Sequence, residues 1–282
     1  MFRSYLYVPA TRPEFFPKAA VGDADAIVID LEDAVAPNAK QQARENLSQL
    51  LLSEYANHKP VFVRVNGDEQ VFDDIKAISA QIAGIRLPKC ECADTTRAVD
   101  KALLDVEQKL GLMEGSIELI PMVETARGLF LMDDVVAASS RIKRFDFGAG
   151  DYDRDIGGRK TPERLETLFA RGYIASRSRF LGLERPLGHV TSIMDPDTLH
   201  RICKEDSSIG FFGRSCIHPK QVAIINNAFN PTEQELAKAR SIVEHFEARA
   251  DGGTGAFFMP DNSFVDMATY RRAKKFVAEF DK

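Results

Sequence analysis

Short apolar runs alternate along this chain with longer amphipathic stretches. Eight runs of four to eight residues are mainly aliphatic or aromatic and are followed by polar residues, glycine or proline, a pattern that predicts β-strands. They are Tyr5–Val8, Ala26–Asp30, Val61–Val65, Gly84–Leu87, Ile117–Met122, Arg144–Gly148, Phe180–Leu187 and Gly210–Cys216. The seventh run is the weakest strand prediction, because it contains a proline and two charged residues.

Amphipathic segments separate these runs. Asn38–Leu52 has apolar residues at helical spacing after Pro37, and Asp94–Leu110 opens on residues that favour a helix N-terminus. Four further segments continue the alternation: Thr125–Ser139, Pro162–Ser176, Pro196–Lys204 and Pro219–Phe229. Alternating strands and helices favour a parallel sheet, and eight such units predict an α/β fold of the (β/α)8 TIM-barrel class.

The alternation stops near residue 230. Pro231 begins a helical stretch with charges at i,i+4 spacing, glycines interrupt residues 251–255, and a last helical pattern follows. We therefore expect a TIM-barrel catalytic domain over residues 1–230 and a C-terminal helical extension over residues 231–282. Glycines beside an active-site cover often act as hinges, so the extension is either a lid or a domain joined by an ordinary loop.

Acidic side chains stand where several predicted strands end. Glu124 and Asp151 follow the fifth and sixth strands, and Glu32 and Asp33 follow the second. In a barrel these ends gather on the face that carries the active site. Two carboxylates with open space between them suit Mg²⁺, which fills its remaining coordination sites with water and substrate. The alternative is that each acid caps the helix that follows it.

Basic residues at two other strand ends predict an anionic substrate. Arg64 ends the third strand, where a guanidinium binds a carboxylate bidentately or stabilises an enolate oxygen. An ion pair with Asp30 or Glu32 is the alternative, and both interpretations can hold at once. Lys89 follows the fourth strand, and nearby acids should raise its pKa. We therefore expect a charged, substrate-binding lysine rather than the neutral amine that a Schiff base needs.

Composition narrows the class of protein. The 282 residues carry a net charge of −5, which argues against a nucleic-acid-binding surface. No apolar run approaches the roughly 18 residues that span a bilayer, and the first residues lack the apolar core of a signal peptide. The four cysteines do not form a zinc-binding pattern. We expect a cytoplasmic protein with reduced thiols and with neither a nucleic-acid nor a membrane partner.

The motifs at these strand ends resemble, in the same order, those of the citrate lyase β-subunit-like family within the HpcH/HpaI aldolase superfamily. The matching segments are RSYLYVPA at 3–10, DLEDAVAP at 30–37, VRVNG at 63–67, LPK at 87–89, IPMVETARGL at 120–129, FGAGDY at 147–152, GRSCIHPKQ at 213–221 and FVDMATYRRA at 264–273. DLEDAVAP is particularly similar to the segment found in malyl-CoA and citramalyl-CoA lyases. The resemblance runs over nearly the whole chain.

The resemblance implies a role for each matching acid and arginine. Glu124 and Asp151 would bind Mg²⁺, with Mn²⁺ as the alternative metal. Glu32 and Asp33 would bind metal-bound water and orient the site, and Arg64 would contact substrate and take part in catalysis.

It also implies contacts beyond the metal site. Asp266 would reach into a neighbouring subunit for proton transfer, because family members assemble as homotrimers or larger homo-oligomers. Glu124 would also contact the substrate, as would Lys89, and Arg12 and Lys18 would meet the phosphates of coenzyme A.

The implied reaction is Mg²⁺-dependent carbon–carbon cleavage of a short carboxylated 3-hydroxyacyl-CoA. Citramalyl-CoA, giving acetyl-CoA and pyruvate, is the first expectation and malyl-CoA the second. A citryl-thioester lyase β subunit, a class II aldolase acting on free 2-oxo acids and a non-catalytic barrel binding protein are the alternatives. The substrate stays open because Gly150 stands where the family often has glutamate, and Leu187 and His189 stand near the position of a usual aspartate.

Overall fold

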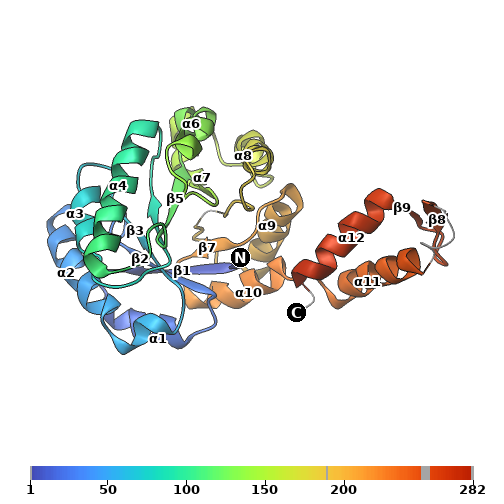
Figure 1. Cartoon of the computed structure of the whole chain (residues 1–282), viewed down its shortest axis with the longest axis horizontal. Coiled ribbons are helices and arrows are strands. Elements are labelled where there is room, and N and C mark those ends of the chain that lie inside the picture. The colour runs from blue at the N-terminus through green and yellow to red at the C-terminus, as the bar shows by residue number, and fades with distance from the viewer. Residues whose placement is uncertain (1, 189, 249–254, 281–282) are drawn as a thin grey trace. The chain divides into compact units, whose positions relative to one another are not determined.

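The computed structural model describes residues 2–188, 190–248 and 255–280. The chain divides into two compact units, Met1–Phe229 and Asn230–Lys282. The first unit contains a sheet of seven strands in the order β6-β5-β4-β3-β2-β1-β7, and all of its strand pairs are parallel (Figure 1). The strands are β1 (Ser4–Pro9), β2 (Ala26–Asp30), β3 (Val61–Arg64), β4 (Gly84–Leu87), β5 (Glu118–Val123), β6 (Asp146–Phe147) and β7 (Arg214–Cys216).

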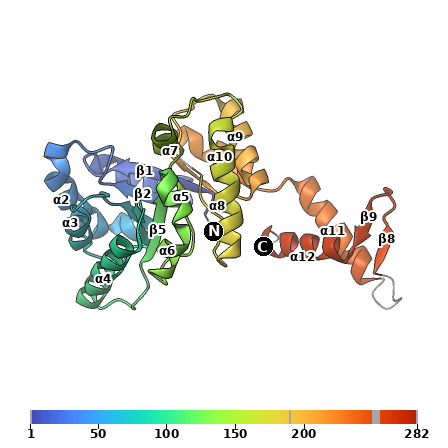
Figure 2. The same cartoon turned by 90° about the horizontal axis from the view of Figure 1, so that it is seen from above.

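Helices pack around the outer face of this curled sheet (Figures 1 and 2). They are α1 (Phe16–Val21), α2 (Lys40–Leu51), α3 (Val71–Lys76), α4 (Ala93–Leu110), α5 (Ala126–Phe130), α6 (Met132–Ala137), α7 (Ala149–Ile156), α8 (Leu168–Phe180), α9 (Pro196–Ile209) and α10 (Pro219–Phe229). Short 3₁₀ turns lie at Pro13–Phe15, Pro37–Ala39, Glu54–Asn57 and Leu165–Thr167. The predicted alternation of strands and helices is confirmed.

The prediction of a strand over Phe180–Leu187 is wrong over most of its length. α8 continues to Phe180, and only Leu187 and Gly188 form isolated parallel bridges, to Asp146 of β6 and Arg214 of β7. Pro186 has no N–H to donate to a ladder, which limits regular pairing here. The two bridges nevertheless lie between the edge strands of the seven-stranded sheet. Closure into an eight-stranded barrel stays a prediction.

Aromatic and aliphatic side chains fill the interior of the sheet. One buried cluster joins strands far apart in the sequence: Tyr5, Tyr7, Ala26, Val28, Phe62, Ile120 and Leu187. β2 to β5 are buried along their whole length, as expected of parallel strands covered by helices. The candidate site forms at the ends of these strands, where polar side chains follow the apolar runs.

The second unit is a helical hairpin with a small sheet. It contains α11 (Glu233–Glu247), the antiparallel pair β8 (Ala256–Phe258) and β9 (Phe264–Asp266), and α12 (Met267–Phe280). Thr232 and Glu235 form a capping box that begins α11, so the helix predicted after Pro231 is present. Residues 251–254 of the predicted glycine hinge lie outside the described residues, and a lid function stays a prediction. No helix in the described ranges has the length and apolarity needed to cross a membrane.

Candidate active site

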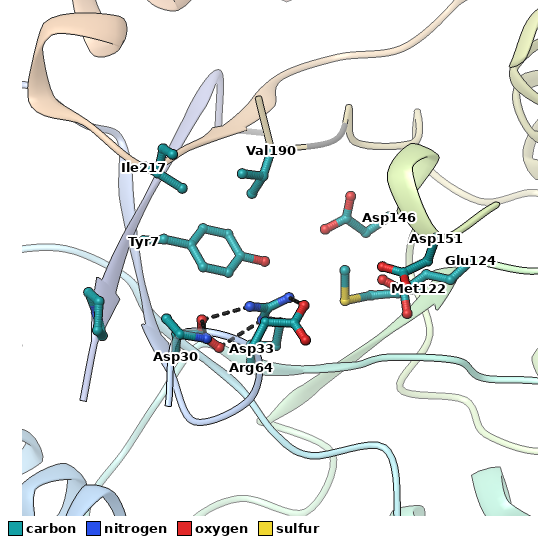
Figure 3. A pocket seen from close by; sticks show the side chains of 12 residues that line it. Tyr7, Asp30, Asp33, Arg64, Met122, Glu124, Asp146, Asp151, Val190 and Ile217 are labelled. Carbon is teal, nitrogen blue, oxygen red and sulfur yellow. Dashed lines mark hydrogen bonds and ion pairs between the residues drawn. The ribbon is translucent and has the colours of Figure 1, made fainter. Parts of the chain in front are cut away.

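A cavity of about 430 Å³ lies at the C-terminal ends of the parallel strands (Figure 3). Its wall brings together four of the predicted site residues, namely Asp33, Arg64, Glu124 and Asp151. The full lining is Tyr7, Pro9, Asp30, Asp33, Ala34, Arg64, Met122, Glu124, Asp146, Asp151, Val190 and Ile217. Acids dominate its charged groups, which suits a site that binds a cation.

Glu124 is held in place from two sides. It follows β5 directly and is only 3% exposed, and its Oε2 accepts a hydrogen bond of 2.9 Å from the backbone N–H of Lys89. Lys89 adopts a φ of 48°, a left-handed conformation that is uncommon for a residue with a side chain. On the other side, a Cβ atom at Gly148 would lie 2.5 Å from Glu124 Oε1. The glycine therefore makes the space that the carboxylate occupies.

The electrostatics of this carboxylate favour a bound cation. Burial and the negative charges of Glu32 and Asp151 together raise the pKa of Glu124 to about 8, although the Lys89 N–H bond lowers it. Asp151 lies in the first turn of α7 and accepts a 2.8 Å hydrogen bond from Arg154. The described residues hold no group of three or more His, Cys, Asp or Glu side chains arranged around one ion. Two carboxylates that leave room for water and substrate fit Mg²⁺.

We expect Mg²⁺ to bind more tightly as the pH rises toward about 8.5, because the metal must displace a proton. The pKa of Glu124 in the folded, metal-free protein is about 8, so the carboxyl is largely protonated at neutral pH. Calorimetric titration with MgCl₂ in buffers of different ionisation enthalpy should show release of about one proton per ion near neutrality. A pH-independent affinity without proton release would contradict this electrostatic account.

Gly148→Ala is expected to weaken Mg²⁺ binding by about 10- to 100-fold, because the new methyl group displaces the Glu124 carboxylate. The clash is with a side chain, so the protein should still fold. Gly172→Ala in α8 is the matched control, because nothing lies within 4 Å of a Cβ there. That substitution should stabilise the helix by about 0.5–1 kcal/mol and leave Mg²⁺ affinity unchanged. Equal Mg²⁺ affinity in the two variants, measured by calorimetry, would rule out the steric role.

Arg64 is bound firmly by the acids around it. Its Nε and Nη2 donate to the two oxygens of Asp30 at 2.7 and 2.6 Å, and Nη1 lies 2.9 Å from Glu32 and 3.2 Å from Asp33. Its guanidinium also lies 5.1 Å from the centre of the Tyr7 ring. Burial lowers the pKa of Arg64, but the hydrogen bonds and charge of Asp30 outweigh it, and the net shift is upward. The ion pair predicted for Arg64 is therefore present, in a side chain that also faces the cavity.

The loop after β2 is anchored by Lys40. Its Nζ donates to the carbonyl oxygens of Leu31 and Glu32 at 2.7 and 2.8 Å and to Asn66 Oδ1 at 2.6 Å. This fixes the backbone that carries Glu32, whose carboxylate lies 3.5 Å from Lys89 Nζ. Burial lowers the pKa of Lys89, yet Glu32 and Glu124 prevail and raise it, as the sequence predicts. Lys89 is thus charged at neutral pH.

Five predicted site residues are not part of the cavity lining: Glu32 and Lys89, which lie beside it, and Arg12, Lys18 and Asp266. Arg12 and Lys18 are exposed, and Arg12 pairs with Glu14 at 2.6 Å. Asp266 ends β9 in the second unit, where its Oδ1 accepts hydrogen bonds from the backbone N–H and hydroxyl of Thr269 at 2.8 and 2.7 Å. The roles predicted for Arg12, Lys18 and Asp266 stay predictions. His189, which stands near the position of the family's usual aspartate, lies outside the described residues.

Sequence reasoning missed several residues of the wall. Asp146 is the most informative, because it is an acid inside the apolar run of β6 and is only 2% exposed. A charge in a buried strand was the available signal, since such a group needs a partner. Its partner, Arg86, lies in β4, and no local pattern joins two residues so far apart in the chain.

The family of the chain follows from a match over most of its length. A family model described as HpcH/HpaI aldolase/citrate lyase matches residues 3–219. The chain belongs to this family. A second model, described as a C–C bond lyase of the TIM-barrel fold, matches residues 167–278. The predicted family, and with it the prediction of a carbon–carbon lyase, is confirmed.

Individual members of the HpcH/HpaI aldolase/citrate lyase family are similar over nearly their full length. A citrate lyase subunit beta-like protein of Deinococcus radiodurans is 32% identical over 281 residues, covering 97% of this chain and 95% of the relative. The L-malyl-CoA/beta-methylmalyl-CoA lyase of Cereibacter sphaeroides is 29% identical over 301 residues, covering 98% and 94%. The crystal structure of the protein CitE from Mycobacterium tuberculosis, in complex with magnesium, acetoacetate and coenzyme A, superposes with a TM-score of 0.80 at 25% identity, covering 100% and 98%.

Proposed function

We propose that this protein is a Mg²⁺-dependent lyase that cleaves a short carboxylated 3-hydroxyacyl-CoA. The observation that carries the proposal is the placement of Glu124 and Asp151 in one cavity with Arg64. The complex of the similar CitE structure with magnesium and coenzyme A supports both the metal and the thioester. Citramalyl-CoA, giving acetyl-CoA and pyruvate, is the first substrate to test, and malyl-CoA is the second.

The bond that breaks joins the α-carbon, next to the thioester carbonyl, to the β-carbon, which bears the hydroxyl. The hydroxyl proton leaves, the hydroxyl carbon becomes the carbonyl of a 2-oxo acid, and the electron pair passes to the enolate of acetyl-CoA. The enolate carbon then takes a proton. Glu124 and Asp151 would hold Mg²⁺, which when bound would act as a Lewis acid toward the hydroxyl and carboxylate oxygens.

The other residues of the cavity orient these steps. Arg64 is fixed by its two hydrogen bonds to Asp30 and faces the cavity. Its guanidinium can stabilise negative charge that develops on the enolate oxygen. Glu32 and Asp33 hold the third guanidinium nitrogen from the opposite side. Asp33 lines the cavity and its side chain is 64% exposed. We therefore assign Asp33 the role of the base that accepts the proton of the substrate hydroxyl.

Release assays with Mg²⁺ test the function directly. The purified protein should release acetyl-CoA and an oxo acid from citramalyl-CoA, supplied as both stereoisomers, or from malyl-CoA. Cleavage of citryl-CoA alone would instead identify a citrate lyase β subunit, and turnover of free 2-oxo acids alone an aldolase of class II. A folded, Mg²⁺-loaded protein that cleaves none of them would overturn the CoA-thioester lyase proposal in favour of a lyase subunit that depends on a carrier protein or of a non-catalytic binding protein.

We also propose that Asp266 acts in a neighbouring subunit of a cytoplasmic homotrimer or larger assembly, built on closed (β/α)8 barrels. The Thr269 N–H and hydroxyl bonds lower the pKa of Asp266, so the carboxylate is charged at neutral pH, which is the form that accepts a proton. That is the role needed to form the enolate in the condensation direction, and cleavage requires the protonated form. The isolated bridges at Leu187 and Gly188 and the TIM-barrel family model support the closed barrel.

Mixed assemblies test the shared site. Asp266→Asn and Glu124→Gln protomers are each expected to be inactive, and mixing them should restore activity once subunit exchange is verified by mass. Exchange without restored activity would place Asp266 within its own chain.

Substitution of Arg12 or Lys18 by an uncharged residue should weaken thioester binding more than oxo-acid binding. Equal weakening of both ligands would remove Arg12 and Lys18 from the coenzyme A site.

A further inference from the structure

A buried ion pair lies in the interior of the sheet, beside the cavity. Arg86 of β4 is fully buried, and its Nη1 donates to Asp146 Oδ2 and to Ser215 Oγ at 2.6 Å each and to the Tyr7 hydroxyl at 3.2 Å. Its guanidinium also lies 4.5 Å from the centre of the Tyr5 ring. These contacts tie four strands together around one charged group.

Only the acidic end of this pair reaches the cavity. Asp146 lines it, whereas Arg86 does not appear in the lining. The second oxygen of the carboxylate, Oδ1, is buried and receives no hydrogen bond from any residue in the described part of the chain. In Figure 3 the Asp146 carboxylate and the Tyr7 hydroxyl point toward one another across the upper part of the cavity. A charged oxygen in such a place is costly unless a donor meets it.

The remaining acids of the cavity are already engaged. Both oxygens of Asp30 accept hydrogen bonds from Arg64, and Glu124 and Asp151 are assigned to the metal. Asp33 also pairs with Arg64, at 3.2 Å. Asp146 Oδ1 is therefore a buried acceptor at the cavity that has no hydrogen-bond partner among the described residues and is not assigned to the proposed metal.

The chemistry of this acceptor selects a ligand. A carboxylate oxygen accepts hydrogen bonds and gives none, so its partner must be a hydroxyl or another N–H or O–H donor. A methyl group would leave it unpaired, and a second substrate carboxylate would be repelled by it. Sites that bury a polar group for one substrate discriminate strongly against an analogue that lacks the matching group.

We propose that Asp146 is a substrate-binding residue that accepts a hydrogen bond from a hydroxyl on the oxo-acid half of the substrate. This deepens, and rests on, the proposed lyase function. Within the class of short 3-hydroxyacyl-CoA thioesters, the enzyme then favours one whose oxo-acid product carries its own hydroxyl, ahead of citramalyl-CoA. A citryl thioester, which brings an extra carboxylate, is disfavoured.

A purely structural role for Asp146, as the counter-ion of Arg86, is the competing explanation. The two explanations differ in one measurable quantity, the ratio of affinities for two ligands that differ by a hydroxyl. Pyruvate and hydroxypyruvate are such a pair. Binding of each to the Mg²⁺-loaded protein, measured by calorimetry, needs no turnover and so does not depend on which thioester is cleaved.

The wild-type protein should bind hydroxypyruvate about 10-fold or more tightly than pyruvate, the effect of a hydrogen bond to a charged group. The double variant Arg86→Met/Asp146→Leu removes both charges together, which avoids an uncompensated buried charge. In that variant the ratio should fall to about one. Asp146→Asn keeps a neutral acceptor and should give an intermediate ratio.

The matched control is a second buried pair that does not line the cavity. Arg144 and Glu118 interact at 2.8 Å with side chains that are 7% and 8% exposed. Arg144→Met/Glu118→Leu should perturb the fold to a similar degree and preserve the ligand ratio. Thermal melts verify that each variant is folded before its ratio is interpreted.

Each outcome has a separate meaning. A wild-type ratio near one, binding of neither oxo acid, or equal weakening of both ligands in the double variant would overturn the role of Asp146. Cleavage of citramalyl-CoA together with a ratio near one would leave the lyase function standing while this inference fails. A clear preference for hydroxypyruvate that the double variant abolishes, in a protein that cleaves no thioester, would support the hydroxyl site and overturn the lyase.

Discussion

Replacing Glu124 with glutamine is expected to abolish Mg²⁺-dependent activity and, at the same time, to stabilise the metal-free protein. The activity loss follows from removing a proposed metal ligand, and several kcal/mol of transition-state stabilisation correspond to about a 10³-fold slower reaction. The gain in stability follows from burial, because the carboxylate is 3% exposed and its pKa is raised to about 8. Glutamine keeps the shape and removes the charge.

The pH dependence fixes the sign of the stability effect. A carboxyl group whose pKa is higher in the folded than in the unfolded protein destabilises the fold as the pH rises from its ordinary pKa toward about 8. Near pH 4 the wild-type protein and Glu124→Gln should have similar free energies of unfolding, since the Glu124 carboxyl is mostly protonated in both the folded and the unfolded state. Above about pH 8 the variant should be more stable by an amount on the order of a few kcal/mol.

Thermal melts with and without Mg²⁺ at both pH values measure this. Wild-type protein should gain stability from Mg²⁺ at high pH, whereas Glu124→Gln should not respond to the metal. Glu114→Gln, at an exposed position outside the cavity, is the control and should behave as wild type. Persistent Mg²⁺-dependent activity in Glu124→Gln, or a loss of stability at high pH, would contradict the metal assignment or its electrostatic basis.

The parts of the fold that could be predicted are those that depend on local patterning. β2 and β4 have the bounds that their apolar runs predict, because a buried parallel strand flanked by polar residues leaves a clear local signal. The acids after such strands could be placed at one end of the sheet by topology alone. Glu124, Asp151 and Arg64 therefore come together in the cavity as the sequence predicts.

The parts that could not be predicted depend on contacts between distant residues. Leu187 and Gly188 join the sheet only through one bridge each, to β6 and to β7, so the residues around them carry no strand pattern. Arg86 and Asp146 are each an isolated charge in an apolar run, and their meaning appears only when β4 and β6 meet in the sheet interior. The space that Gly148 leaves for Glu124 likewise depends on two segments packing together.

The cavity combines two kinds of buried acid with different consequences for stability. Asp30 is matched by a bidentate arginine, whereas Glu124 is surrounded by other acids and has a raised pKa. A bound cation would offset the repulsion between Glu124 and the acids around it. It would not replace Arg64 as the partner of Asp30. Removing Arg64 should therefore harm the protein with or without metal, unlike the change at Glu124.

Arg64→Met is accordingly expected to lower the free energy of unfolding by about 3–5 kcal/mol and to abolish activity, because it leaves Asp30 charged, buried and unpaired. Adding Asp30→Asn removes that charge and should recover much of the stability without recovering activity, which separates the structural from the catalytic role. The control is Arg97→Met, in an exposed pair with Asp94, which should cost less than about 1 kcal/mol. Urea unfolding and turnover measured on the same samples decide the matter. If the double variant regains activity together with stability, Arg64 serves only to balance Asp30, and the charge on the enolate oxygen must be stabilised by another group.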